Sequence, residues 1–241
     1  MINKITLIII KIFDYFHKKK IINFLKKNKN YKFDTILDIG GHYGESIELF
    51  LKNFPVKKII SFEASPKNFE TLKSRYRNLS KTFSGTDIVI ENLATGNDEK
   101  LLSINQFTES SSSTIKNINE NSKYFKKKFF FLKNKNKLLF RKLDIKVVKL
   151  KNYLIDKNVK NIDFLKIDTE GYEKETILGL GEKIKNVKLI FFEHHYDNMI
   201  IKNYKFRDLN KILVENNFFQ ILKIKMPLRK SFEYIYENKK I

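Results

Sequence analysis

Residues 36–45 read ILDIGGHYGE. The apolar start of this stretch is typical of a buried strand that ends at Ile39, before the glycine pair, and a helix is predicted to begin near Gly44. The pair Gly40 and Gly41 lets the backbone turn sharply and approach a ligand closely. A strand, a glycine-rich turn and a helix in this order are typical of a ligand-binding unit, because the helix N-terminus offers unpaired amides to a carboxylate or phosphate.

The residues around the glycines narrow the choice of ligand. A phosphate-binding loop of the Walker type needs Lys and then Ser or Thr after its last glycine, whereas Glu45 follows Gly44 here. Dinucleotide-binding turns have the spacing G-x-G-x-x-G, and this turn has D-x-G-x-x-x-G. The spacing therefore disfavours phosphate binding and leaves dinucleotide binding open.

Strand-like and helix-like segments alternate from Asp34 onward, which is the pattern of a parallel sheet with helices on both faces. The predicted strands are residues 35–39, 58–62, 87–92, 162–167, 187–192, 218–224 and 232–236. Predicted helices begin near Gly44, at Ser65-Pro66 and at Phe206, and another carries Ile177, Leu178 and Leu180. Residues 101–107 and 143–150 also look like strands, but the order of elements between Glu99 and Leu150 is ambiguous.

Acidic residues follow two of the predicted strands. Glu63 comes after the strand 58–62, about twenty residues beyond the glycine turn, where a carboxylate can accept both ribose hydroxyls of an adenosine. Asp168 and Glu170 follow the strand 162–167. We expect these side chains at one site, because ligands of an open α/β sheet bind at the carboxyl ends of its strands.

Three motifs in this order resemble the FkbM family of S-adenosylmethionine-dependent methyltransferases. They are D-I-G at residues 38–40, F-E-x-x-P at 62–66 and L-K-I-D-x-E-G-x-E at 165–173, and residues 189–193 (LIFFE) resemble the family's next strand. The resemblance covers residues 34–236. It implies an α/β fold with a Rossmann-like, doubly wound sheet of seven strands, mostly parallel with an antiparallel last strand, as in class I methyltransferases.

The resemblance also implies that the cofactor is S-adenosyl-L-methionine. The residues expected to hold it are Asp38, Gly40, Gly41, Gly44, Glu63, Asn92 and Leu93. Asp38, Gly40 and Gly44 would flank its methionine end, Glu63 would hold its ribose, and the two residues at the tip of the strand 87–92 would lie near its adenine.

The glycine turn departs from the family's pattern at two positions. His42 stands at an asparagine-like position, and the pair Gly40-Gly41 replaces a more usual Gly-Ala, so we expect a cofactor pocket of altered shape. Residues 110–113 (SSSS) resemble a serine-bearing loop of the family that would contact the acceptor, and a flexible polar linker is the alternative.

Methyl transfer is an in-line displacement, so aligning the acceptor and excluding water supply most of the catalysis. A sugar-type hydroxyl is a poor nucleophile until a base accepts its proton. The candidate bases are Asp168, His195, Glu170 and His194. We rank Asp168 and His195 first because both follow strands whose ends should line one cleft, while Glu170 has the alternative role of a helix N-terminal acid.

Metal chemistry is not part of this prediction. Asp168, Glu170 and His194 would suit a divalent ion, but their spacing is not diagnostic. The chain contains no cysteine, which excludes disulfides, thiolate zinc sites and cysteine nucleophiles.

The 241-residue chain carries 48 Lys and Arg against 27 Asp and Glu, a net charge of +21. This charge would favour phosphate-rich partners or an anionic membrane. However, the abundant residues are those with AT-rich codons, so the base composition of the genome can account for the charge. We therefore favour a solvated surface over a dedicated binding face. The leading hypothesis is O-methylation of a saccharide, glycolipid or secondary-metabolite hydroxyl. A nucleic-acid methyltransferase is disfavoured because residues 168–171 read DTEG rather than Asn/Asp-Pro-Pro-aromatic, and a catalytically silent membrane-surface module is the third possibility.

Residues 1–30 are predicted to form an amphipathic helical extension to a methyltransferase domain at 31–241. On a helix, one face would carry Ile5, Ile8, Ile9, Ile12, Phe13 and Phe16, and the basic run 18–20 follows. Such a helix suits peripheral contact with the anionic inner face of a membrane, but we favour packing against the domain or a second subunit. Lys11 and Asp14 interrupt the apolar stretch, so neither a spanning helix nor a signal peptide is predicted.

These features together predict a cytoplasmic protein with a small-molecule or glycan acceptor and the capacity to form an oligomer. We do not expect a nucleic-acid partner.

Overall fold

Seven strands form the central sheet of the protein in a computed structural model. The structure describes residues 2–28, 31–108, 112–131, 139–227 and 229–241, and their side chains from Phe13 onward except those of 128–131. The order across the sheet is β11 (Phe218–Lys225), β12 (Ser231–Asn238), β9 (Val187–His195), β8 (Ile162–Ile167), β1 (Thr35–Ile39), β2 (Lys58–Phe62) and β3 (Asp87–Glu91). Only β12 runs antiparallel to its neighbours in this sheet. The predicted mostly parallel sheet with an antiparallel last strand is therefore confirmed.

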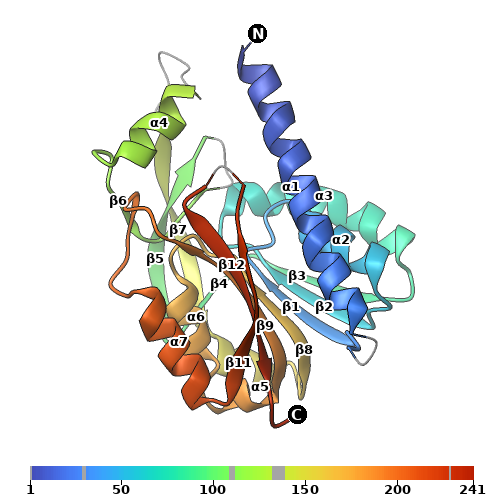
Figure 1. The fold of residues 1–241 in the computed structure, drawn as a ribbon. Helices are drawn as coiled ribbons and strands as arrows, with labels where there is room; N and C mark the ends of the chain where they lie inside the picture. The colour runs from blue at the N-terminus through green and yellow to red at the C-terminus, as the bar shows by residue number, and fades with distance from the viewer. Residues whose placement is uncertain (1, 29–30, 109–111, 132–138, 228) are drawn as a thin grey trace.

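Helices cover both faces of this sheet, as Figure 1 shows. They are α1 (Ile2–Lys27), α2 (Glu45–Asn53), α3 (Pro66–Thr82), α5 (Leu150–Asp156), α6 (Glu173–Gly179) and α7 (Phe206–Glu215), with a short 3-10 helix at Gly181–Asn186. A further helix, α4 (Lys123–Phe131), packs through Phe125 on Phe107 of β5 and on Met199 and Ile200. The helix at Ser65-Pro66 starts as predicted, because the Ser65 hydroxyl accepts a hydrogen bond from the Asn68 amide and Pro66 occupies the first helical position.

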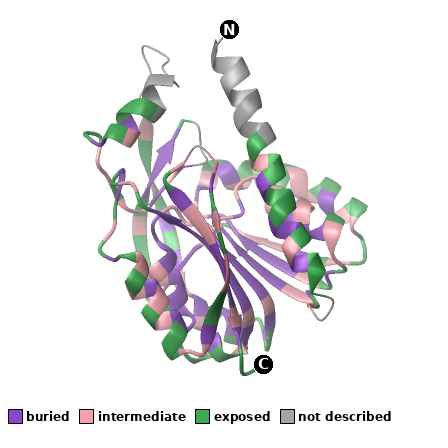
Figure 2. Ribbon diagram, viewed as in Figure 1, coloured by how far each residue is buried: buried purple, intermediate pink, exposed green. Residues whose placement is uncertain are grey.

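Alternation along the strands divides the core into two layers, since successive side chains of a strand point to opposite faces. Ile36 of β1 packs with α1, α2 and α3 on one face. Its neighbour Leu37 packs with α5, α6 and α7 on the other face. Figure 2 shows how completely the central strands are buried between these layers.

Two strands of the ambiguous region between Glu99 and Leu150 form a separate small sheet together with a strand just before that region. Its strands are β4 (Ala94–Gly96), β7 (Phe140–Lys149) and β5 (Lys100–Phe107), in that order. Strands β6 (Asn117–Ile118) and β10 (Ile200–Ile201) pair antiparallel and form another, two-stranded sheet. The two strands predicted here exist, but they do not join the seven-stranded sheet.

Strand β9 continues three residues beyond its predicted end. Its pairing with β12 extends to the contacts His194 with Phe232 and His195 with Ser231. The two histidines are therefore the last residues of the strand, where we had expected them to follow it. The hydrophobic pattern stops at Phe192, but the ladder of backbone hydrogen bonds does not.

The C-terminal half of α1 packs against the domain. His17, Ile21 and Leu25 are buried, whereas Phe13 and Phe16 are 45% and 55% exposed. The packing side thus differs from the predicted apolar face, whose members Ile5, Ile8, Ile9 and Ile12 have side chains outside the described residues. Among the described residues, no helix combines the length and apolar character needed to cross a bilayer.

Truncating Leu25 tests whether α1 is part of the core. We expect Leu25→Ala to lower the free energy of unfolding by about 3 kcal/mol, because it leaves a cavity between α1 and the sheet. The exposed Phe16→Ala should change it by less than about 0.5 kcal/mol. Urea denaturation with unchanged slopes measures both, and equal effects would contradict this packing.

Candidate active site

A cleft of about 1940 Å³ opens at the carboxyl ends of the central strands. Its floor is formed by the tips of β1, β2, β8 and β9, and its walls come from the small sheet, α1, α4 and the turn between β11 and β12. The strand order reverses between β1 and β8, which is where doubly wound sheets bind ligands. The volume exceeds the roughly 300–1,000 Å³ of pockets for one small ligand, so the cleft has room for two.

Asp38 organises the floor of the cleft. Its buried carboxylate accepts hydrogen bonds from the hydroxyls of Ser46 (2.7 Å) and Ser61 (2.9 Å), and it forms an ion pair with Lys166 at 2.9 Å. The Lys166 ammonium also donates to the Gly40 carbonyl at 3.1 Å. Burial opposes the charge on Lys166, but Asp38 and Asp168 outweigh it and raise the pKa of Lys166 above its ordinary value.

The glycines of the turn serve the packing of the protein itself. Gly40 has φ +85°, and a Cβ there would overlap the Asp168 carbonyl oxygen. A Cβ on Gly41 would overlap the Ser61 hydroxyl. The glycines therefore let the backbone of the turn come close to the tip of β8 and to β2, and not only to a ligand as we had expected. This contact brings the tips of three strands together.

His42 adopts a left-handed conformation with φ +48°. Asn, Asp and His enter this region more readily than other residues with a side chain, which explains why histidine fits the asparagine-like position noted in the sequence. The ring of His42 stacks on that of Tyr43, with centroids 3.7 Å apart. Its backbone amide points to Glu63.

Glu63 presents a buried carboxylate to the cleft. One oxygen accepts the His42 amide at 2.7 Å, and the other accepts the Ser65 amide at 2.9 Å and, more weakly, the Asn68 side chain at 3.4 Å. A carboxylate has about four acceptor positions, so the two short contacts leave room for the two hydroxyls of a ribose. Burial raises the pKa of Glu63 to about 7, although the hydrogen bonds from the Ser65 and His42 amides favour the charged form and act to lower this pKa.

The tip of β8 carries the acids of the third motif. The Asp168 side chain is 42% exposed within the cleft and lies 3.9 Å from the Lys166 ammonium. Desolvation at the cleft floor raises the pKa of Asp168 above its ordinary value. The charge of Lys166 lowers this pKa, and the charge of Glu193 raises it further.

Two consecutive left-handed residues, Glu170 (φ +49°) and Gly171 (φ +99°), then reverse the chain. Glu173 holds this reversal, because its buried carboxylate accepts the Gly171 amide at 2.8 Å and the Thr169 hydroxyl at 3.1 Å. Tyr204 donates a further short hydrogen bond to Glu173. The last acid of the motif is thus structural, and it aims Glu170 into the cleft.

His195 is the histidine that lines the cleft. Its Nε2 atom lies 3.1 Å from Glu170 and 3.4 Å from Glu193, and its Nδ1 atom lies 3.6 Å from Asp197. Burial opposes a charge on this ring, but Glu170 and Glu193 outweigh it and raise the pKa of His195 well above its ordinary value. The three carboxylates around His195 therefore favour its imidazolium form.

His194 points to the opposite face of β9. Its ring packs against Tyr196, Tyr204 and Phe206, with centroids 4.9 to 5.8 Å away. The metal grouping of Asp168, Glu170 and His194 is therefore not brought together, and in the described part of the chain no group of three or more histidine or acidic side chains is arranged to hold an ion.

The remaining candidates fall in different places. Leu93 lines the cleft, whereas the Asn92 amide donates to the backbone carbonyls of Glu63 (2.8 Å) and Ala64 (3.3 Å) and so ties β3 to the β2 tip. Of the serine run, Ser112 and Ser113 line the cleft, and Ser110 and Ser111 lie outside the described residues.

Several cleft residues carried no role in our sequence analysis. Lys166, Glu193 and Arg229 are the main ones. Lys166 and Glu193 stand inside quoted motifs at positions where an apolar strand is interrupted by a charge, and that interruption was the available signal. Arg229 lies in a turn far along the chain, with no pattern around it to mark it.

The strand order, the glycine turn after β1 and the acid after β2 define the fold of class I methyltransferases. The solved structure of methyltransferase FkbM from Methylobacillus flagellatus KT is similar to this chain, with a TM-score of 0.55 and 16% identity, over 84% of this chain and 43% of that one. Magnesium protoporphyrin IX methyltransferase (ChlM) from Synechocystis PCC 6803, solved with bound SAM, gives a TM-score of 0.53 and 10% identity, over 95% and 82%. At such identities the likeness shows the fold alone.

This chain belongs to the FkbM methyltransferase family, because the sequence model of the methyltransferase FkbM domain matches residues 38–220. The match includes the glycine turn, Glu63 and the tips of β8 and β9. No curated protein matches the sequence. The chain spans less than half the length of the Methylobacillus FkbM protein.

His194 gives a test of the described burial. Burial lowers the pKa of His194 to about 3, with the charges of Lys202 and His195 adding to this. The unfolded state therefore binds an extra proton below pH ~6.5, so stability is lost as the pH falls. From about pH 7 to about pH 5, wild type should lose about 2 kcal/mol more than His194→Phe, as measured by urea denaturation. Parallel losses in the two proteins would place His194 in solvent.

Proposed function

We propose that this protein transfers a methyl group from S-adenosylmethionine to a hydroxyl of a saccharide, glycolipid or secondary-metabolite scaffold. One observation carries the proposal: a single cleft holds Glu63 and Asp168 at the tips of β2 and β8, on either side of the glycine turn that follows β1. The family of the chain and the room for two ligands support the same function.

The residues of the β1 and β2 tips suit the cofactor. Glu63 would hold the ribose through its remaining acceptor positions, the turn from Gly40 to Gly44 would lie along the methionine end, and Leu93 would line the adenine side. Bound S-adenosylmethionine supplies the methyl group on a sulfonium centre that is already an activated leaving group. The chain itself must align the acceptor and take up its proton.

Asp168 is the base that the geometry supports best. Its carboxylate is accessible in the cleft, and its raised pKa makes it a stronger base than an ordinary aspartate. Nearby Lys166 is held by Asp38 and stays charged, so it stabilises the carboxylate until the proton arrives.

His195 has a different part in this proposal. An imidazolium with a strongly raised pKa cannot accept the proton of a hydroxyl. Its charge holds the carboxylates of Glu170 and Glu193 beside each other at the cleft floor, where they can accept hydrogen bonds from other hydroxyls of the acceptor. His195 is thus a positioning residue.

The pKa of Glu63 makes cofactor binding depend on pH. The charged carboxylate offers acceptors to both ribose hydroxyls, and protonation removes one of them, so binding should weaken as the pH falls through about 7. We expect the Kd of S-adenosylmethionine to rise about tenfold from about pH 8 to about pH 6, by calorimetry. Glu63→Gln should bind more weakly with a flat profile. A flat profile in wild type would remove Glu63 from the site.

Replacing Asp168 tests the catalytic step. Asp168→Asn should keep the Kd of S-adenosylmethionine within about twofold and lower kcat by about 10² or more, because the amide cannot accept a proton. Transfer of labelled methyl groups to a panel of saccharides measures this. For wild type, kcat should rise with pH as Asp168 loses its proton.

The exposed Asp156→Asn on α5 is the matched control and should behave as wild type. Turnover by Asp168→Asn at the rate of wild type would rule out Asp168 as the base.

A further inference from the structure

Buried carboxylates and exposed ammonium groups both line the cleft. The carboxylates of Glu63, Glu170 and Glu193 lie at the floor and are mostly buried. The mouth carries five exposed ammonium groups, which we call the basic rim. These are Lys18, Lys123, Lys127, Lys225 and Lys230.

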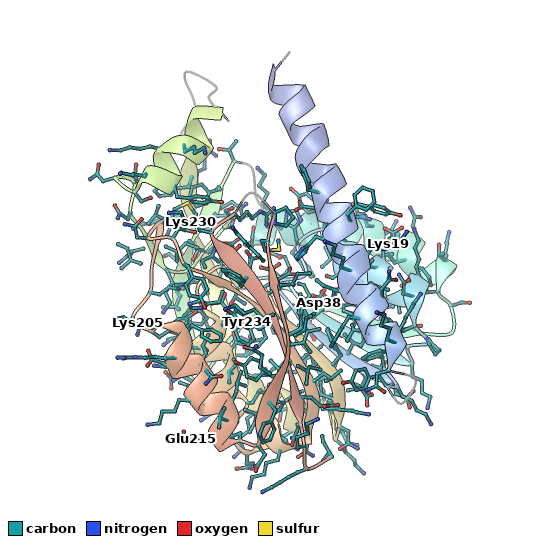
Figure 3. All side chains as sticks on the ribbon, viewed as in Figure 1. Lys19, Asp38, Lys205, Glu215, Lys230 and Tyr234 are labelled. Carbon is teal, nitrogen blue, oxygen red and sulfur yellow. The ribbon has the colours of Figure 1, made fainter. Side chains whose placement is uncertain are left out.

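The basic rim comes from three segments far apart in the sequence. Lys18 lies on α1, Lys123 and Lys127 lie one turn apart on α4, and Lys225 and Lys230 flank the turn between β11 and β12. In Figure 1 the ends of β11 and β12 rise between α1 and α4. Figure 3 places Lys230 at this end of β12, on the side of α4. The three segments share the cleft as their common boundary.

Within the described ranges, no carboxylate forms an ion pair with the basic rim. None of its five ammonium groups forms an ion pair there, whereas Lys52, Lys57 and Lys151 elsewhere on the surface all do. Lys123 and Lys127 stand four residues apart on one helix, an arrangement in which like charges repel. Positive charge that converges on a low-dielectric cleft concentrates anions there.

We propose that the basic rim binds a phosphate or diphosphate group of the acceptor, so that the substrate is a phosphorylated saccharide. This inference rests on the proposed methyl transfer and assigns the substrate class to the same cleft. Several lysines suit a multiply charged phosphate, which Lys binds as a point charge. The sugar hydroxyl would then reach Asp168 at the floor, while the phosphate stays at the mouth, away from the buried carboxylates.

The shape of the basic rim favours this ligand over a nucleic acid. A nucleic-acid strand needs positive groups along a track several nucleotides long. The five lysines instead all line one cleft. The phosphate can belong to a soluble sugar phosphate or to a lipid-linked one. The exposed Phe13, Tyr15 and Phe16 of α1 lie close to Lys18 in sequence, where they could contact the lipid of a lipid-linked acceptor.

The test uses full-length protein saturated with S-adenosylhomocysteine and the triple variant Lys123→Gln, Lys127→Gln, Lys230→Gln. The control is Lys160→Gln, Lys185→Gln, two exposed lysines before β8 and β9, at the amino ends of the strands. Calorimetry with inorganic pyrophosphate and glucose 1-phosphate should show affinity about tenfold weaker in the triple variant than in wild type or control. Plain glucose should not distinguish the three proteins.

Equal affinity for glucose 1-phosphate in all three proteins would overturn the proposal. Tighter binding of a single-stranded RNA oligomer than of pyrophosphate, lost in the triple variant, would also overturn it by assigning the basic rim to nucleic acid. Cofactor binding is measured separately in each protein. If it survives while the phosphate probes fail, the substrate class is wrong and the methyltransferase function stands.

Vesicles separate the two phosphate sources. Phosphatidylcholine vesicles containing a polyprenyl diphosphate should retain wild type and release the triple variant if the acceptor is lipid-linked. If glucose 1-phosphate binds through the basic rim and these vesicles retain neither protein, the acceptor is soluble.

Discussion

The buried ion pair between Lys166 and Asp38 is the interaction on which the rest of the site depends. It joins β8 to β1 at the point where the strand order reverses. Ser46 brings α2 to the same carboxylate, and Ser61 brings β2. Removing one partner of such a pair leaves an unpaired buried charge and costs about 3–5 kcal/mol. With both partners present, three strand tips are held in register, and Asp168 is placed beside the glycine turn.

Charge balance then determines the chemistry of the cleft. Burial raises the pKa of Glu63 and Asp168, while the cations Lys166, His195 and Arg229 lie among the acids of the cleft. Arg229 also lies 3.4 Å from Asp14 of α1, and His17 of α1 is 2.6 Å from Glu233 of β12. The N-terminal helix is thus joined to the cleft wall by two polar contacts as well as by its buried apolar face.

Much of the fold could be predicted because the central strands are buried on both sides. Apolar runs bounded by turns gave β1, β2 and β8 with their observed limits. In the small sheet, β7 begins three residues before the predicted strand 143–150, where the exposed Arg141 and Lys142 give no apolar pattern. The packed side of α1 was missed because the more apolar half of the helix lies before the half that docks.

The site could be predicted as a set of residues more readily than as a set of roles. Motif order placed Asp38, Glu63 and Asp168 at strand tips, where the structure has them. It could not show which of two adjacent histidines faces the cleft, because that depends on how far β9 pairs with β12. Nor could it show that the pKa of His195 is raised, because Glu170, one of the acids around it, comes from the separate tip of β8.

A crystal structure with S-adenosylhomocysteine tests the central claim most directly, namely that the tips of β1, β2 and β8 form one cofactor and acceptor site. The account predicts the ribose hydroxyls on Glu63 and the sulfur on the Asp168 side of the cleft, with the ion pair of Lys166 and Asp38 unchanged. A ligand bound elsewhere, with Glu63 contacting only its own backbone donors, would contradict it.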